Sequence, residues 1–220
     1  LPQTIFSSNN SFLLTAIPMF ILMSEILRKA NVTEVLFDAV TKFVGHLPGG
    51  LAVSTVITCA IGASITGSSV ANAASMSIVA APSMIKRGYD RKFIYGLIAA
   101  SGTLGILIPP SIPMLLYASI TEVSIGKLFI SGIVPGLVLV ILLCLYVILK
   151  EKFFDNKDRK IEKATISAKL RSFKTALPAL ILPVIVVGGI YAGFFTPTEA
   201  AGVGVFFAFI LGFFWYRTLK

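Results

Sequence analysis

Residues 51–85 form a 35-residue stretch without a charged side chain, as expected of a chain embedded in a membrane. Its centre reads GASITGSSVANAAS, which is polar and contains glycine where a membrane span should be most apolar. A helix over residues 51–65 would reach only about 22 Å at 1.5 Å per residue, short of the roughly 30 Å hydrocarbon core. We therefore expect the segment to enter the membrane and turn back as a re-entrant helical hairpin. Non-helical backbone at that depth is tolerated only where it is buried in protein or lines a cavity.

The composition predicts an all-α polytopic membrane protein. Hydrophobic residues make up 56% of the chain and charged residues only 13%, far from the values of soluble globular domains. Apolar runs at 11–27, 128–149, 177–195 and 198–216 are expected to be membrane spans. The sequence begins without methionine or a signal-peptide pattern and stops just after an apolar run, so we expect a fragment of a longer protein.

The charged residues gather in the loops between the apolar segments. These loops are residues 28–50, 86–92, 150–174 and 217–220, and assigning them to one side places 18 of the 19 Lys and Arg residues there. By the positive-inside rule that side is the cytoplasm, with Lys127 as the exception near the opposite face. The net charge of +9 therefore reflects membrane topology, and we expect no nucleic-acid partner.

Two further segments have informative patterns. Residues 32–46 place apolar residues at helical spacing with charged residues on the other face, which predicts an amphipathic helix in the membrane interface. Residues 93–121 contain the pair Pro109-Pro110, whose missing amide hydrogens and ring clashes must interrupt a helix. A broken helix beside the hairpin would offer a second set of unpaired carbonyls.

The tip of the hairpin combines features of an ion site. The first half-helix is expected to end near Ile65 with free carbonyls, which attract a cation. The second begins near Ser68 or Ser69 with free amides, which attract an anion. Several hydroxyls surround the tip, and Gly62 and Gly67 allow close approach of the backbone. Hard oxygen ligands of this kind suit a small cation. The alternative is that the small residues only let helices pack closely.

Titratable side chains are missing from the segments that should lie deepest in the membrane. No Asp, Glu, Lys, Arg or His occurs in residues 51–85 or 93–121. Paired half-helices of the kind predicted here suggest a transporter's binding site. A proton relay would need titratable groups at that depth, so the sequence favours sodium over protons as the coupling ion. The motifs HExxH and GxSxG and a phosphate-binding loop do not occur, and we expect neither an enzyme nor ATP coupling.

Other classes of membrane protein remain open at this point. An ion channel or pore subunit also uses re-entrant hairpins, as selectivity filters, and is the main alternative to a transporter. A membrane enzyme would need acid, base or metal constellations that the sequence does not contain. A purely structural membrane partner predicts that substitutions at the tip leave transport unchanged.

Four segments, GHLPGGLA, GASITGSSVANAAS, GTLGILIPPSIPMLLYA and TPTEAAGVG, occur in an order that resembles the large membrane subunit of tripartite ATP-independent periplasmic (TRAP) transporters. The likeness covers most of residues 11–216, and GSSVA and LIPPS are its most specific parts. It implies an elevator-type transporter built from two inverted repeats, each with a hairpin and a broken helix, of which one is present here. Residues 1–50 would then hold a scaffold span and an amphipathic arm, 51–121 half of the transport domain, 122–176 a span with a basic cytoplasmic loop, and 177–220 the start of the second repeat.

The resemblance also implies a function and partners. The expected function is sodium-coupled secondary uptake of an organic acid, of the sialic acid or C4-dicarboxylate class, across the bacterial inner membrane. The expected partners are a small membrane subunit, a periplasmic substrate-binding protein, the organic-acid substrate and the lipid bilayer.

Carried onto this sequence, the resemblance places a sodium ion (Na+) between the hairpin tip and the segment across from it. The expected sodium ligands are Ser64, Gly67, Ser68, Ser69, Gly102, Thr103 and Gly105. The substrate carboxylate would approach the amide end of the second half-helix. The expected substrate-binding residues are Ser68, Ser69, Val70, Asn72, Pro110 and Ser111.

Overall fold

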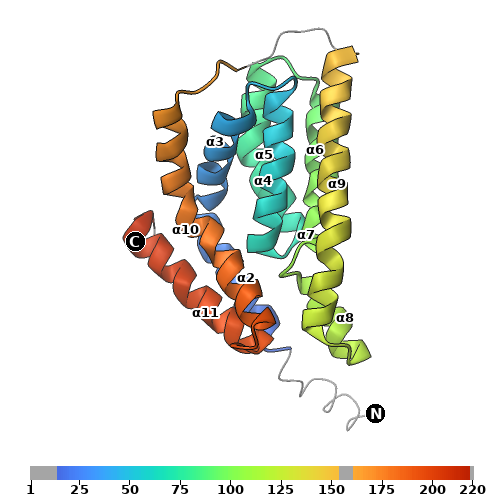
Figure 1. Ribbon diagram of the computed structural model, residues 1–220, viewed down its shortest axis with the longest axis vertical. Helices are drawn as coiled ribbons and strands as arrows, with labels where there is room; N and C mark the ends of the chain where they lie inside the picture. The colour runs from blue at the N-terminus through green and yellow to red at the C-terminus, as the bar shows by residue number, and fades with distance from the viewer. Residues whose placement is uncertain (1–13, 154–160, 219–220) are drawn as a thin grey trace.

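The computed structural model describes residues 14–153 and 161–218, and every regular element in this part of the chain is a helix. The predicted all-α class is confirmed, and Figure 1 shows most of the helices running roughly along the long axis of the molecule. In chain order they are α2 (Ala16–Lys29), α3 (Val32–Val44), α4 (Gly50–Thr66), α5 (Ser69–Lys86), α6 (Arg91–Gly102), α7 (Leu104–Leu107), α8 (Ile112–Thr121), α9 (Ile125–Phe153), α10 (Ile166–Tyr191), α11 (Pro197–Ile210) and the π-helix η1 (Leu211–Trp215).

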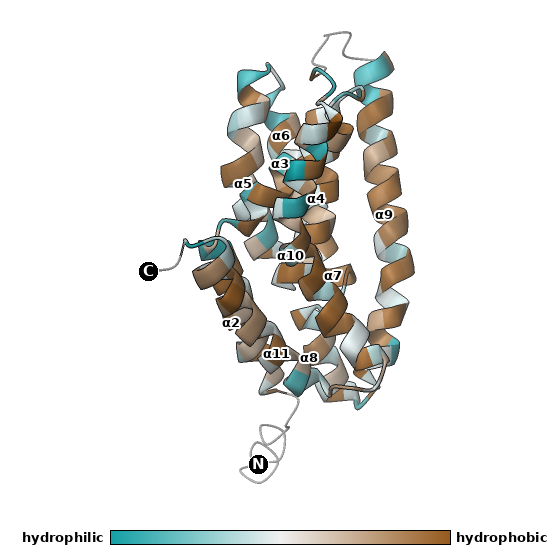
Figure 2. Ribbon diagram, turned by 60° about the vertical axis from the view of Figure 1, so that its left-hand side comes forward, coloured by the Kyte–Doolittle hydropathy of each residue, from teal (hydrophilic) through white to brown (hydrophobic). Residues whose placement is uncertain are grey.

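Four helical segments of the described chain are long and apolar enough to cross a membrane: Arg91–Thr121, Ile125–Phe153, Ile166–Tyr191 and Pro197–Trp215. The most apolar 18 residues of α9 are only 17% buried inside the protein, so most of their hydrophobic side chains face outward. In the ribbon of Figure 2, α9 is coloured as hydrophobic along most of its length, with hydrophilic residues at its upper end. The chain is therefore a multi-pass membrane protein.

Helices α4 and α5 form the predicted hairpin and lie side by side in Figure 1. Only Gly67 and Ser68 separate them, which is possible because Gly67 adopts a left-handed φ of +60° that ends α4. Ser68 caps the next helix, since its side chain accepts a hydrogen bond from the amide of Ala71. The observed ends, Thr66 and Ser69, lie within one residue of the predicted ones. At 17 residues, α4 is short for a full span, in agreement with a re-entrant segment.

The helix that follows is interrupted where the prolines predict. Regular structure stops at Leu107, and the chain resumes a helix at Ile112 after an extended stretch around Pro109-Pro110. A second, smaller interruption at Thr103 separates α6 from α7. The sequence did not predict this one, because no proline marks it.

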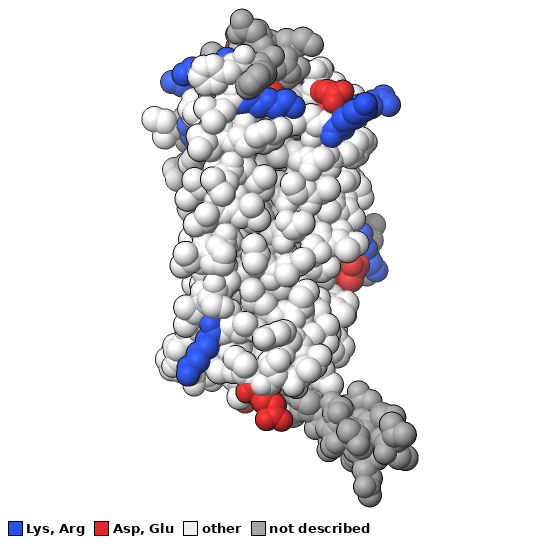
Figure 3. All heavy atoms as spheres, turned by 90° about the vertical axis from the view of Figure 1, so that its right-hand side faces the viewer, with Lys and Arg blue, Asp and Glu red and all other residues white. Residues whose placement is uncertain are grey.

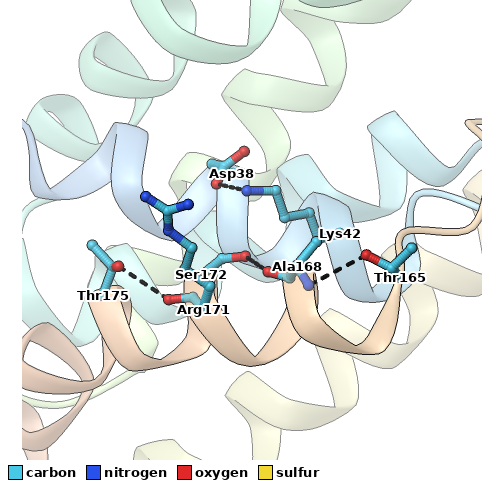
Figure 4. Close-up of polar contacts among 7 residues, drawn as sticks. All are labelled: Asp38, Lys42, Thr165, Ala168, Arg171, Ser172 and Thr175. Atoms are coloured by element: carbon cyan, nitrogen blue, oxygen red, sulfur yellow. Dashed lines mark hydrogen bonds and ion pairs between the residues drawn. The ribbon is translucent and has the colours of Figure 1, made fainter.

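The amphipathic helix predicted for residues 32–46 is α3, but its polar face meets another helix. Figure 4 shows Asp38 and Lys42 of α3 facing Arg171 and Ser172 of α10, and a groove of about 760 Å³ runs between the two helices. Within α3, the Lys42 ammonium lies 2.6 Å from the Asp38 carboxylate.

Helix α10 begins at Ile166, so the last part of the loop predicted for 150–174 is helical and continues without a break into the span predicted from residue 177. Residues 154–160 of that loop lie outside the described residues.

Two groups of buried apolar side chains hold the helices together. The first joins α2, α10 and α11 with α8 and the start of α9, and includes Phe20, Met23, Phe129, Leu182 and Val186. The second joins the hairpin, α6 and the end of α9, and includes Val56, Met76, Met84, Ile94 and Val147. The first group also includes Ile65 at the end of α4 and several residues of α3, so the end of the first hairpin helix contacts both groups.

Charged side chains mark the two ends of the molecule. Figure 3 shows them at the top and bottom with a wide, mostly uncharged band between. The C-terminal end of α2 does not reach the upper end, because Arg28 and Asn31 line one cavity with Ala71 from the first turn of α5 and Ser75 from nearer its middle. From Ser75 to the basic end of α5 at Lys86 is about 16 Å at 1.5 Å per residue. The start of the predicted loop 28–50 therefore lies deeper than loop 86–92, whereas its end lies beside the end of α9, since Gly49 packs against Glu151.

Candidate functional site

The hairpin tip lies directly against the interrupted segment α6–α7–α8. The amide of Ile112, the first residue of α8, donates a hydrogen bond of 3.0 Å to the carbonyl of Gly67 at the tip. Gly105 of α7 packs against the peptide group between Ser68 and Ser69. The two constellations predicted from separate parts of the sequence are therefore brought into main-chain contact.

Glycines make this contact possible, because there is no room for a side chain at their positions. A Cβ atom added at Gly105 would lie 2.8 Å from the amide nitrogen of Ser69. One added at Gly67 would lie 2.8 Å from the carbonyl oxygen of Pro110, and one at Gly102 would meet α5 at the same distance. Real Cβ atoms do not approach other atoms this closely. Gly67, Gly102 and Gly105, all predicted as sodium-site residues, must therefore be glycine for this contact to form.

Main-chain groups at both half-helix ends remain available. Among the described residues, no hydrogen bond reaches the carbonyl oxygens of Ser64, Ile65 and Thr66 in the last turn of α4. The amides of Ser69 and Val70 in the first turn of α5 likewise have no acceptor within the described chain. The tip therefore offers oxygen ligands to a cation on one side and N–H donors to an anion on the other.

The hydroxyls of the tip support the same chemistry. Ser64 and Thr66 donate to main-chain carbonyls of α4 at 2.7 and 3.0 Å. Ser68 accepts from the amide of Ala71 at 3.4 Å. A hydroxyl that donates once still carries two acceptor lone pairs, so these oxygens can also face a cation. Thr66 is buried and was not among the predicted ligands.

Four predicted site residues have other surroundings. The side chain of Val70 is 78% exposed. Thr103 is exposed, and its hydroxyl donates to the carbonyl of Ala100 in α6 at 2.7 Å. Asn72 is buried between the two helices of the hairpin, where its Nδ2 donates to the carbonyl of Cys59 at 2.8 Å. Ser111 is buried, and its hydroxyl donates to a carbonyl of α7 at 2.8 Å. The main chain around these four residues lies at or near the tip, but their side chains have separate surroundings and do not form one group.

The sequence reasoning missed two groups. Ile112 contributes the amide that joins α8 to the tip, and its position as the first residue of a half-helix could have indicated a free donor. Ser101 is fully buried, and its hydroxyl has no hydrogen-bond partner within the described chain. It lies at helical spacing from the core residues Ile94 and Ile98, whereas Thr103 does not. That spacing distinguishes the inward-facing hydroxyl from the outward-facing one.

The donor set at the tip is neutral. Residues 51–85 contain no Asp, Glu, Lys, Arg or His, and no group of three His, Cys, Asp or Glu side chains gathers anywhere in the described part of the chain. Carbonyl and hydroxyl oxygens without thiolate or imidazole suit an alkali or alkaline-earth cation rather than a transition metal.

The chain was compared with known proteins. The family model for the "Tripartite ATP-independent periplasmic transporter, DctM component" matches residues 1–220. The C4-dicarboxylate TRAP transporter large permease protein DctM of Pseudomonas aeruginosa is 39% identical over 218 residues, covering 98% of this chain and 50% of that protein. The ectoine TRAP transporter large permease protein TeaC of Halomonas elongata is 39% identical over 94% of this chain and 48% of its own length.

A third relative adds another substrate name. The sialic acid TRAP transporter large permease protein SiaM of Vibrio cholerae is 35% identical, covering 99% of this chain and 50% of the relative. The chain thus spans about half the length of the curated relatives it matches. These relatives are named as transporter permeases, in agreement with the expectation that the chain is not an enzyme. Together with the helical hairpin and the interrupted helix, the matches confirm the resemblance: the chain belongs to the DctM family of TRAP transporter large permeases.

Proposed function

We propose that this chain is half of the membrane pathway for sodium-coupled uptake of an organic acid. One observation carries the proposal: the hairpin tip, with its unpaired carbonyls and amides, packs by main-chain contact against the interruption in α6–α7–α8. A site made of two half-helix ends and a broken helix is the arrangement that secondary transporters use for ions and anionic substrates.

In this proposal sodium is a co-transported substrate that binds first. The carbonyls of Ser64, Ile65 and Thr66, with nearby hydroxyls, surround the ion, and the backbone of Gly102 and Gly105 lies across from them. Binding there orders the tip, so that the amides of α5 are held in position for a carboxylate. Coupling follows because the anion site is complete only when the cation is present.

The substrate is proposed as a chemical class. The relatives carry the names of C4-dicarboxylate, ectoine and sialic acid transporters, so family membership does not select one compound. A carboxylate matches the helix-end amides. We propose an organic acid of the sialic acid or C4-dicarboxylate class.

The remaining parts of the proposal follow from the family. A tripartite system has further components, which we propose to be a small membrane subunit and a periplasmic binding protein that delivers the substrate. The membrane would be the bacterial inner membrane, with the basic ends of the helices in the cytoplasm. The hairpin with α6 and α7 would move as a rigid body against α2, α10 and α11, in the manner of an elevator.

Uptake of labelled sialic acid and succinate into proteoliposomes tests this function. The complete transporter is needed, with its binding protein present or omitted and with or without a sodium gradient. Uptake that saturates and requires both the gradient and the binding protein supports the proposal. Flux that ignores sodium and does not saturate would favour the pore subunit instead.

A substitution at the tip tests the site itself. We expect Ser68→Ala to weaken the sodium dependence of uptake more than it lowers the amount of folded protein in the membrane, because the hydroxyl organises the turn. Ser131→Ala on α9 is the control, since it removes an exposed hydroxyl whose hydrogen bond, donated to the carbonyl of Leu128, lies within its own helix. Equal loss of uptake and of folded protein in Ser68→Ala would indicate a packing role.

A further inference from the structure

A further cavity, separate from the hairpin tip and from the spaces beside α3 and α2, lies between α6 and the end of α9. Its volume is about 380 Å³, and it opens near the turn that joins α5 to α6. This is the basic end of the molecule, where the charged side chains of Figure 3 gather at the top. The residues used below are Lys92, Phe93, Gly96 and Ala100 from α6, and Tyr146 and Lys150 from α9.

Two ammonium groups border the mouth of this cavity. The Nζ atom of Lys150 lies 3.6 Å from the centre of the Phe93 ring, a cation–π contact that holds the charge at the cavity. Lys92 is exposed in the first turn of α6. The nearby carboxylate of Asp90 accepts a hydrogen bond from the amide of Phe93 and so caps the helix. Neither lysine forms an ion pair with an acidic group of the described residues.

Below the charged mouth, the walls are apolar and leave space. A Cβ atom added at Gly96 would find no atom within 4 Å. Ala100, one turn farther along α6, is exposed, and Tyr146 on α9 is 54% exposed. The cavity therefore combines two lysine ammonium groups and the helix-capping carboxylate of Asp90, a net positive charge, with an open apolar channel along α6 and α9.

We propose that this cavity binds one anionic phospholipid. The phosphate group lies between Lys92 and Lys150, and an acyl chain follows the channel over Gly96 and Ala100. Basic pockets between transmembrane helices suit anionic headgroups, because each lysine near the surface attracts them and the apolar wall receives the chain. The proposal needs only the membrane-embedded fold and does not depend on sodium coupling.

The first test measures the lipid that stays with the purified, complete transporter. Detergent-solubilised protein is reconstituted with phosphatidylglycerol and washed, and the retained lipid is counted by native mass spectrometry. Replacing both lysines, Lys92→Gln with Lys150→Gln, should weaken retention about 30-fold, since each charge contributes about 1 kcal/mol. The control pair, Lys86→Gln with Lys152→Gln, removes the same charge from the same end but outside the cavity, and should retain the lipid.

A second test addresses the acyl channel. In Gly96→Leu the added Cβ atom meets no atom within 4 Å, and the rest of the side chain should occupy the channel. We expect phosphatidylglycerol to raise the melting temperature of the unmodified transporter and this substitution to abolish the rise. Gly188→Leu is the matched control, because a Cβ atom at Gly188 on α10 also meets nothing within 4 Å.

Several results would overturn the proposal. Equal lipid loss in the two lysine pairs would mean that the surface attracts anionic lipid without a site. An equal thermal shift with phosphatidylethanolamine would remove the role of charge, and an equal shift with glycerol phosphate would remove the role of the chain. Absence of bound lipid in the complete transporter would mean that another part of the protein covers the cavity.

Discussion

At the scale of single residues, we expect a substitution at Gly105 to have the largest effect on stability and uptake, because glycine leaves no side chain in a tight contact. In Gly105→Ala the new Cβ atom would lie 2.8 Å from the amide of Ser69, so the tip and α7 must move apart. We expect a loss of about 1–3 kcal/mol in stability, as for other overpacked positions, and loss of sodium-dependent uptake. Melting temperature and uptake of the complete transporter measure the two effects. Gly188→Ala, where the added atom finds open space, should change neither. A Gly105→Ala transporter with normal uptake would contradict the proposed role of this contact in transport.

Asn72 was predicted to bind substrate, and its position now predicts a different phenotype. Its Nδ2 donates to the carbonyl of Cys59 and so links the two helices of the hairpin. We expect Asn72→Ala to cost about 1 kcal/mol, the typical net contribution of such a hydrogen bond, and to lower the melting temperature of the transporter. The KM for the organic acid should change little. A large rise in KM at an unchanged melting temperature would instead restore Asn72 as a substrate ligand.

At the scale of elements, the interruption in α6–α7–α8 depends on the proline pair. Replacing Pro109-Pro110 by Ala-Ala supplies two amide donors and two good helix formers, so α7 can extend toward α8. The amide of Ile112 would then bond within the helix and release Gly67. We expect protein of near-normal abundance whose residual uptake no longer depends on the sodium gradient. Pro135→Ala inside the long helix α9 is the control and should keep sodium-dependent uptake. Intact coupling in the Ala-Ala variant would show that the interruption is not needed for it.

Elements also show which parts of the structure the sequence could predict. Turn and cap chemistry located the hairpin ends to within one residue, because glycine with positive φ and a capping serine determine the local backbone. The predicted loop 150–174 is expected to be solvated and partly helical, and the structure is helical from Ile166. The exact start of α10 was not predicted, since its first turns contain many polar residues. Those polar residues face the charged face of α3, a tertiary contact that periodicity alone does not reveal. In the candidate site, the sequence identified the backbone segments that meet. The predicted ligands included Thr103, which is exposed, and omitted Ser101, which is buried, because the prediction took no account of the face of α6 on which each residue lies.

At the scale of the whole molecule, the ends of the helices should be sorted by membrane side. Helix α9 begins near Lys127 and ends near Lys150, so these residues lie at opposite ends of one span. We expect a cysteine at Arg87 or Lys150 to react with an impermeant thiol reagent only from the cytoplasm, and one at Lys127 only from the periplasm. Labelling of intact cells and inverted vesicles, in a background without Cys59 and Cys144, measures this. Reaction of all three positions from one side would exclude the proposed topology.

The contact between the tip and the broken helix is made by main-chain atoms, and it is possible because glycines leave no side chain between them. Every amino acid supplies the same main-chain carbonyl, and all but proline supply the amide, so mutagenesis that removes polar side chains one at a time would leave most of this contact intact. Such a survey could report that the centre of the protein is tolerant. Substitutions that add atoms, at Gly67, Gly102 and Gly105, are the ones expected to reveal its sensitivity, and naturally occurring variants that enlarge these positions are the ones expected to inactivate the transporter.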